Sequence, residues 1–112
     1  MSDRIECLYG AVAARRGGDP TLSRTARLIA MGLPKIAQKV GEEAVEVIID
    51  AIAGERDGVI RESSDLLYHL VVLWQQLGIE PAEIWTEMDR REAKLGIAEK
   101  LPKVSNAGSR AA

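Results

Sequence analysis

The stretch KVGEEAVEVIID, residues 39–50, decides the fold class of this chain. Its apolar residues recur every three or four positions, as on one face of an α-helix, and the pattern continues over residues 34–53. A second stretch, RESSDLLYHL at residues 61–70, belongs to a helical pattern over residues 59–77 that is apolar on much of its surface. Because a helix that is apolar nearly all round is buried on several sides, we expect this second helix at the centre of a bundle.

Helical spacing continues outward from these two segments over most of the chain. We expect three further helices, which cover residues 2–16, 22–30 and 81–94. Thr21 is a candidate cap for the second of these helices, and Pro34 suits the first turn of the long helix. Gly54 and Gly58 bracket an expected loop. No alternating strand pattern is longer than a few residues, so the prediction is an all-α bundle of about four to five helices.

The length and composition fit one small domain. The 112 residues suit a single domain, which we place at residues 1–101. The tail at residues 102–112 is rich in Ser, Gly, Ala and Asn and is expected to be disordered. A chain this short buries a modest core, and it contains no Phe. We therefore expect the bundle to be completed by dimerisation, in a homodimer or a larger homo-oligomer.

Charge and hydropathy exclude two classes of partner. Fifteen Lys and Arg against seventeen Asp and Glu give a net charge of −2, which leaves no basic excess for binding nucleic acid. No apolar run reaches the roughly 18–20 residues that span a bilayer, so no membrane partner is expected. The single cysteine, Cys7, and the absence of an apolar signal region near the N-terminus favour a cytoplasmic protein.

Acidic residues interrupt the apolar surfaces of the two central helices. Successive helical residues turn by about 100°, so Glu43, Glu46 and Asp50 share one narrow stripe, and Glu62 and Asp65 share another. Carboxylates placed close together repel and need protons, basic partners or a cation. Sets of oxygen ligands suit Mg²⁺ or Mn²⁺ rather than zinc, and Mg²⁺ commonly shares its shell with substrate phosphates. The spacing therefore points to metal-assisted phosphate chemistry.

The alternative is that these acids form solvated faces or local salt bridges. Three pairs are spaced to meet within their own segments: Lys39 with Glu42, Arg61 with Glu62, and Arg56 with Asp57. His69, one turn beyond Asp65, also has two interpretations. It is either a hydrogen-bonded core histidine or a partner of a metal-binding carboxylate.

The order of the acids resembles the pattern of a known superfamily. Glu43-x-x-Glu46 followed by Glu62-x-x-Asp65 is similar to the ExxE…ExxD motif of the MazG-like, all-α nucleoside triphosphate pyrophosphohydrolases. This resemblance implies a MazG-like helical bundle that acts on a small nucleotide.

Longer blocks resemble one family within that superfamily. KIAQKVGEEAVEVIIDAI at residues 35–52 and ESSDLLYHLVVL at residues 62–73 are similar to the phosphoribosyl-ATP pyrophosphohydrolases, which catalyse the second step of histidine biosynthesis. The resemblance covers about residues 5–101. It implies Mg²⁺-dependent hydrolysis of the α–β phosphoanhydride of 1-(5-phosphoribosyl)-ATP, with phosphoribosyl-AMP and pyrophosphate as products.

The resemblance also implies roles for the acids. Four of them would be the metal ligands and catalytic residues, with Mg²⁺ as the ion and Mn²⁺ as a substitute: Glu43, Glu46, Glu62 and Asp65. Glu42, about 100° off the stripe, would either support these ligands from behind or orient the attacking water.

Basic residues are the candidates for substrate binding. Lys35 and Lys39 lie one turn apart, upstream of the acids, and are expected to bind phosphates unless they are ordinary surface lysines. Arg90, Arg91 and Lys94 cluster near the end of the last helix. They would bind the 5-phosphate or pyrophosphate part of the substrate, unless they form a solvated face.

Three departures from the family pattern leave other functions open. Arg24 stands where an aromatic residue is expected, Asp50 where a small residue is usual, and Ser64 replaces an alanine. Arg24 would add a phosphate contact or shift the substrate preference, and Asp50 would add a metal ligand. One alternative is a MazG-type housecleaning enzyme that acts on canonical or damaged nucleotides. The other is a non-catalytic helical dimerisation module.

Overall fold

The described part of this computed structural model, residues 3–95, contains five helices and no strand, which confirms the all-α prediction. The helices are α1 (Arg4–Ala13), α2 (Arg24–Met31), α3 (Leu33–Ile52), α4 (Arg56–Gln76) and α5 (Pro81–Leu95). The predicted disordered tail at residues 102–112 lies outside the described residues. Internal contacts divide the chain into two compact units, one that ends at Pro81 and one that begins at Ala82.

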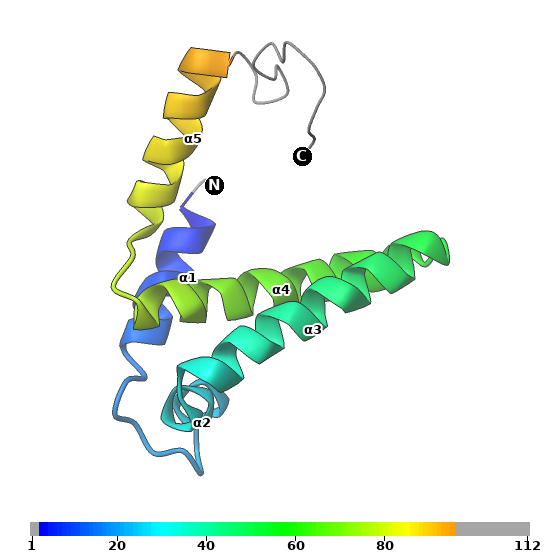
Figure 1. Ribbon diagram of the computed structural model, residues 1–112. Coiled ribbons are helices and arrows are strands. Elements are labelled where there is room, and N and C mark those ends of the chain that lie inside the picture. Colours follow the sequence, from blue (N-terminus) through cyan, green and yellow to red (C-terminus); the bar gives the residue numbers. More distant parts are fainter. Residues whose placement is uncertain (1–2, 96–112) are drawn as a thin grey trace. The chain divides into compact units, whose positions relative to one another are not determined.

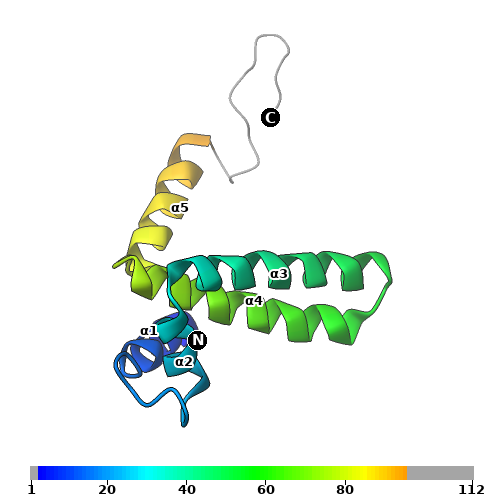
Figure 2. The same cartoon turned by 60° about the horizontal axis from the view of Figure 1, so that its bottom comes forward.

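Helices α3 and α4 form an antiparallel hairpin, which is visible from different sides in Figures 1 and 2. Pro34 lies in the first turn of α3, as predicted. The turn between the helices is short: Gly54 has a φ of 74°, and the Glu55 N–H donates to the Asp50 carbonyl over 2.9 Å. The positive φ at residue 54 explains the glycine at that position.

The expected loop over residues 54–58 is too long, because Gly58 lies inside α4 and is buried. A methyl group at this position would collide with the Asp50 carboxylate and lie 2.8 Å from Asp50 Cγ. Gly58 therefore lets α4 approach α3 closely, and the glycine marks helix packing rather than a turn.

The predicted cap at Thr21 is also wrong. Ser23 caps α2, since its Oγ accepts a hydrogen bond from the Ala26 N–H over 3.0 Å. The Thr21 N–H and hydroxyl instead donate to Asp19 Oδ1, over 2.9 and 2.7 Å. Thr21 thus belongs to a turn that precedes the helix.

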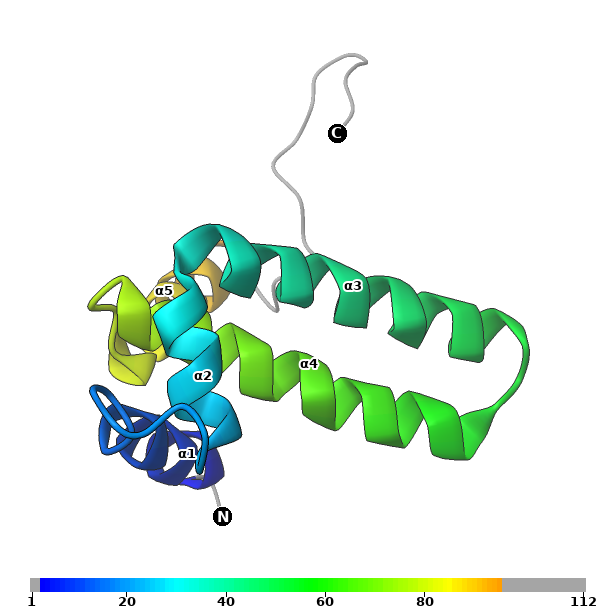
Figure 3. The same ribbon diagram turned by 90° about the horizontal axis from the view of Figure 1, so that it is seen from below.

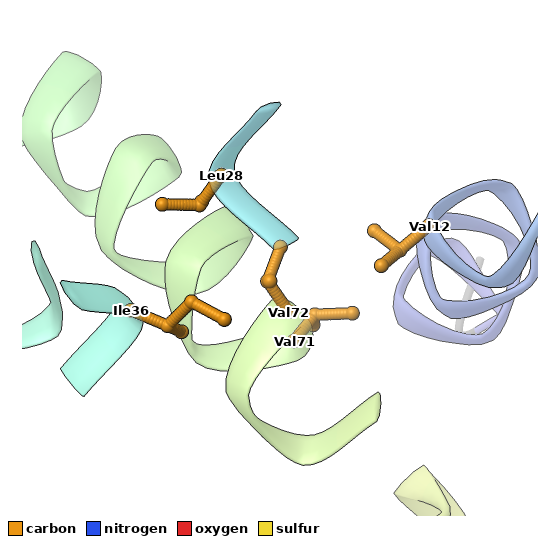
Figure 4. Packing of buried hydrophobic residues seen from close by; sticks show 5 residues of the cluster. All are labelled: Val12, Leu28, Ile36, Val71 and Val72. Atoms are coloured by element: carbon orange, nitrogen blue, oxygen red, sulfur yellow. The ribbon is translucent and has the colours of Figure 1, made fainter. Parts of the chain in front are cut away.

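The core joins the four helices of the first unit. It consists of Val12 from α1, Leu28 from α2, Ile36 from α3, and Val71 and Val72 from α4 (Figure 4). Helix α4 contacts α1, α2 and α3, which confirms its predicted central position. Figure 3 shows α1 and α2 at the end of the hairpin where α3 begins and α4 ends.

The other end of the hairpin, near its turn, exposes large apolar side chains. Ile48 is 59% exposed, Ile52 is 85% exposed and Ile60 is 56% exposed. Val45 and Ile49 add to this apolar face of α3. Over residues 3–95, none of the helices combines the length and the apolar character that a membrane span requires.

Candidate functional site

Three of the predicted metal ligands meet in the middle of the α3–α4 hairpin. Glu43 of α3 and Glu62 and Asp65 of α4 each place one carboxylate oxygen within 4.8 Å of the other two. Glu62 and Asp65 can do so because residues three apart lie on the same face of a helix. Asp50 packs against Gly58 and is not part of this group.

The three acids, called here the acidic cluster, are partly withdrawn from water. The side chains of Glu43 and Glu62 are only 14% and 19% exposed. The pKa of Glu62 is raised, first by a hydrogen bond that its carboxyl group shares with Glu43, then by burial and by the negative charges of Glu43 and Asp65. This is the electrostatic environment in which a cation binds in place of a proton, and the all-oxygen donor set fits Mg²⁺ or Mn²⁺.

The other two predicted acids lie outside the acidic cluster. Glu46 is exposed, one turn further along α3. Glu42 is exposed and accepts a hydrogen bond from Gln38 over 2.6 Å, while Lys39 Nζ lies 3.2 Å from its other oxygen. These two contacts lower the pKa of Glu42, the Gln38 hydrogen bond more than the lysine. Glu42 therefore stays ionised beside the acidic cluster.

Two of the three expected local salt bridges are present. Besides the Lys39–Glu42 pair, Arg61 Nε lies 4.0 Å from Glu62 Oε2. The pKa of Glu62 remains raised despite this pair, so the positive charge of Arg61 does not offset the negative charges of Glu43 and Asp65. The salt-bridge interpretation therefore describes Glu42, whereas Glu43 and Glu62 each have a longer ion pair and also face other carboxylates.

A second feature lies beside the acidic cluster. The predicted phosphate ligands Lys35 and Lys39 line one cavity of about 270 Å³ on α2, α3 and α4, called here the basic pocket. Its other polar lining residues are Arg24, Arg27 and His69. Lys39 connects the two features, since its Nζ also lies 3.9 Å from Glu43 Oε2.

His69 is a buried residue of the basic pocket, with 1% of its surface exposed. Its Nδ1–H donates to the main-chain carbonyl of Asp65 over 2.8 Å. The bond to the main chain favours the core-histidine interpretation over a partner of the carboxylate. Burial is the main cause that lowers the pKa of His69, so the ring is neutral at neutral pH.

Arg24 is held by an aromatic neighbour. Its guanidinium lies 4.9 Å from the centre of the Tyr68 ring, and the hydroxyl groups of Tyr68 and Thr25 are 2.5 Å apart and hydrogen-bonded. A larger cavity of about 840 Å³ lies between α1 and α4 and reaches both Arg24 and Asp65.

Arg27 was not predicted to belong to the site. It lies on α2, and the chain changes direction at Gly32 before α3 begins, so helical spacing relates it neither to Lys35 nor to the acids. The only indication in the sequence that Arg27 belongs to this pocket is its position one helical turn after Arg24.

Two of the basic residues of α5, Arg90 and Arg91, bind an acid of the same helix. Glu87 accepts hydrogen bonds from Arg90, over 2.6 Å to Nη2, and from Arg91, over 2.8 Å to Nε. These bonds lower the pKa of Glu87 to about 2. Lys94 is exposed. A substrate-binding role for these three basic residues stays a prediction.

Comparison with known proteins identifies the family of this chain. The phosphoribosyl-ATP pyrophosphohydrolase family matches residues 6–92. Phosphoribosyl-ATP pyrophosphatase 2 of Bradyrhizobium diazoefficiens is 59% identical over 103 residues, which are 92% of this chain and 77% of that protein. The protein of the same name from Rhodopseudomonas palustris is 58% identical over 92% of this chain and 79% of its own length. Phosphoribosyl-ATP pyrophosphatase of Azospirillum brasilense is 53% identical over 86% of both chains. The chain belongs to the phosphoribosyl-ATP pyrophosphohydrolase family.

Proposed function

We propose that this protein hydrolyses the α–β phosphoanhydride of 1-(5-phosphoribosyl)-ATP to phosphoribosyl-AMP and pyrophosphate, the second step of histidine biosynthesis. Membership of the family and the names of the relatives support this substrate. The observation that carries the proposal is the pairing of an acidic cluster with a basic pocket around Lys39. A substrate with several phosphate groups needs both a divalent cation and fixed positive side chains.

Glu43, Glu62 and Asp65 would hold the Mg²⁺ ion, for which Mn²⁺ would substitute. Mg²⁺ supplies positive charge that stabilises the charge developing on the phosphate oxygens. Glu46 joins the ligands only if its side chain swings toward the acidic cluster when the ion binds. Glu42 is ionised and adjacent, so it is our candidate for orienting the attacking water.

The remaining groups bind substrate. Lys35 and Lys39 bind phosphate groups, and Arg90, Arg91 and Lys94 remain candidates for a further phosphate. The cavity of about 840 Å³ next to Asp65 falls within the roughly 300–1,000 Å³ of small-molecule sites. Its apolar lining, which includes Ile5 and Leu8, suits the nucleoside part of the substrate.

We also propose that two copies of the chain pair through the exposed end of the α3–α4 hairpin. Ile48, Ile52 and Ile60 there are more than half exposed, and apolar patches of this kind mark interfaces between subunits. Localisation in the cytoplasm stays a prediction.

A substrate comparison with purified protein tests the proposal. With Mg²⁺ present, phosphoribosyl-ATP is expected to yield phosphoribosyl-AMP and pyrophosphate, and Asp65→Asn is expected to abolish the reaction. Hydrolysis of deoxynucleoside triphosphates without hydrolysis of phosphoribosyl-ATP would identify a housecleaning enzyme instead. Unchanged Mg²⁺ affinity in Asp65→Asn would favour the non-catalytic module. The chain should also restore growth without histidine to a strain that lacks this activity.

A further inference from the structure

The lining of the basic pocket contains four positively charged side chains and no acidic one. Arg24, Arg27, Lys35 and Lys39 all line its 270 Å³. Within residues 3–95, only Lys39 among these four has an acidic partner in an ion pair. Positive side chains that converge in this way repel one another, so an anion in the pocket lowers the electrostatic energy.

Two residues of the pocket wall, Arg24 and His69, are held in place before any ligand binds. The Arg24 guanidinium lies over the Tyr68 ring, and Tyr68 is itself held by the hydrogen bond to Thr25. The buried ring of His69 is fixed by its bond to the Asp65 carbonyl. Groups that are already positioned lose little conformational entropy when they bind a ligand, which favours affinity.

The size and position of the pocket indicate which anion it takes. Its volume of about 270 Å³ lies just below the roughly 300–1,000 Å³ of sites for drug-sized ligands, so the pocket suits one part of the substrate rather than the whole molecule. Lys39 is shared with the acidic cluster, so an anion here is adjacent to phosphates held at those acids.

We propose that the basic pocket binds the diphosphate end of the substrate, the two phosphate groups that leave as pyrophosphate. Arg24, Arg27, Lys35 and Lys39 supply four positive charges for that group. This inference rests on the proposed function, and it adds Arg24 and Arg27 to the substrate-binding residues. It also predicts that the pocket recognises diphosphate without any divalent cation.

Calorimetric titration of the full chain with sodium pyrophosphate, in buffer containing EDTA, tests the proposal. Arg27→Gln and Lys35→Gln are each expected to weaken binding about tenfold or more, because each removes a charged hydrogen-bond donor. The matched control is Arg56→Gln, which makes the same charge change in the first turn of α4, outside the pocket. It should change the affinity less than about twofold. Inorganic phosphate should bind more weakly than pyrophosphate, because it has one phosphate group instead of two.

Three results would overturn the proposal: no binding of pyrophosphate to the wild type, equal weakening by Arg27→Gln and Arg56→Gln, or sulfate bound as tightly as pyrophosphate.

In turnover assays with Mg²⁺, Arg27→Gln should raise KM far more than it lowers kcat. A wild type that binds pyrophosphate in the pocket but does not hydrolyse phosphoribosyl-ATP would contradict the proposed function alone, since the titration uses neither metal nor substrate.

Discussion

The contact between Gly58 and Asp50 gives a prediction about how tightly the hairpin is packed. In Gly58→Ala the new methyl group meets the Asp50 carboxylate, at 2.8 Å from Cγ and 3.3 Å from Cβ. Overpacking of this kind costs about 1–3 kcal/mol, while alanine favours a helix over glycine by about 1 kcal/mol. We expect a net loss in the free energy of unfolding of about 1 kcal/mol, because the aspartate side chain can partly rotate away.

Removing the carboxylate should reverse this effect. In an Asp50→Ala background the same Gly58→Ala change is expected to stabilise by about 0.5 kcal/mol, so the two positions couple by about 1.5 kcal/mol. Urea unfolding of all four proteins, followed by circular dichroism at one protein concentration, measures this coupling. A coupling below about 0.5 kcal/mol would refute the packing argument. Asp50→Ala should also leave Mg²⁺ affinity unchanged, because Asp50 lies against Gly58.

Further predictions concern single sites. Asp65→Asn should lower Mg²⁺ affinity more than about tenfold in calorimetry, whereas the same change at Asp57 should have little effect. Tyr68→Phe should lower the free energy of unfolding in urea by about 1 kcal/mol, because the Thr25 hydroxyl loses its partner. The pKa of Glu87 is lowered to about 2, so its contribution to α5 is present above the ordinary value of 4.5 and is lost as pH falls toward 2. Helicity measured against pH should show this loss, and the loss should be smaller in Glu87→Gln. Ile48→Asp should yield monomers in analytical ultracentrifugation if the exposed hairpin end is the interface.

The helical fold could be predicted from the sequence because apolar spacing and proline positions are local properties. The errors came where the contact of a side chain, on another helix or within a turn, decides the role of a residue. Gly58 resembles a turn residue until Asp50 of α3 is seen beside it. Thr21 and Ser23 are both residue types that cap helices, and the carboxylate of Asp19 binds Thr21 while Ser23 caps α2.

The arrangement of the candidate site could be predicted only where it depends on spacing along one helix. Spacing along one helix predicts that Glu62 and Asp65 lie close together, and in the structure they do. Spacing does not give the rotation of α3 relative to α4, so it could not tell that Glu43 faces α4 while Glu46 is exposed. The basic pocket depends on the direction of α2, which the positive φ of 97° at Gly32 helps to set, and no pattern within one helix reveals that angle.

The most direct test of the central claim is the reaction itself, measured with Mg²⁺ on wild-type protein and on Asp65→Asn. We expect wild type to convert phosphoribosyl-ATP into equal amounts of phosphoribosyl-AMP and pyrophosphate, and Asp65→Asn to remain folded but inactive. Wild type that leaves phosphoribosyl-ATP intact, or Asp65→Asn that retains full activity, would contradict the account.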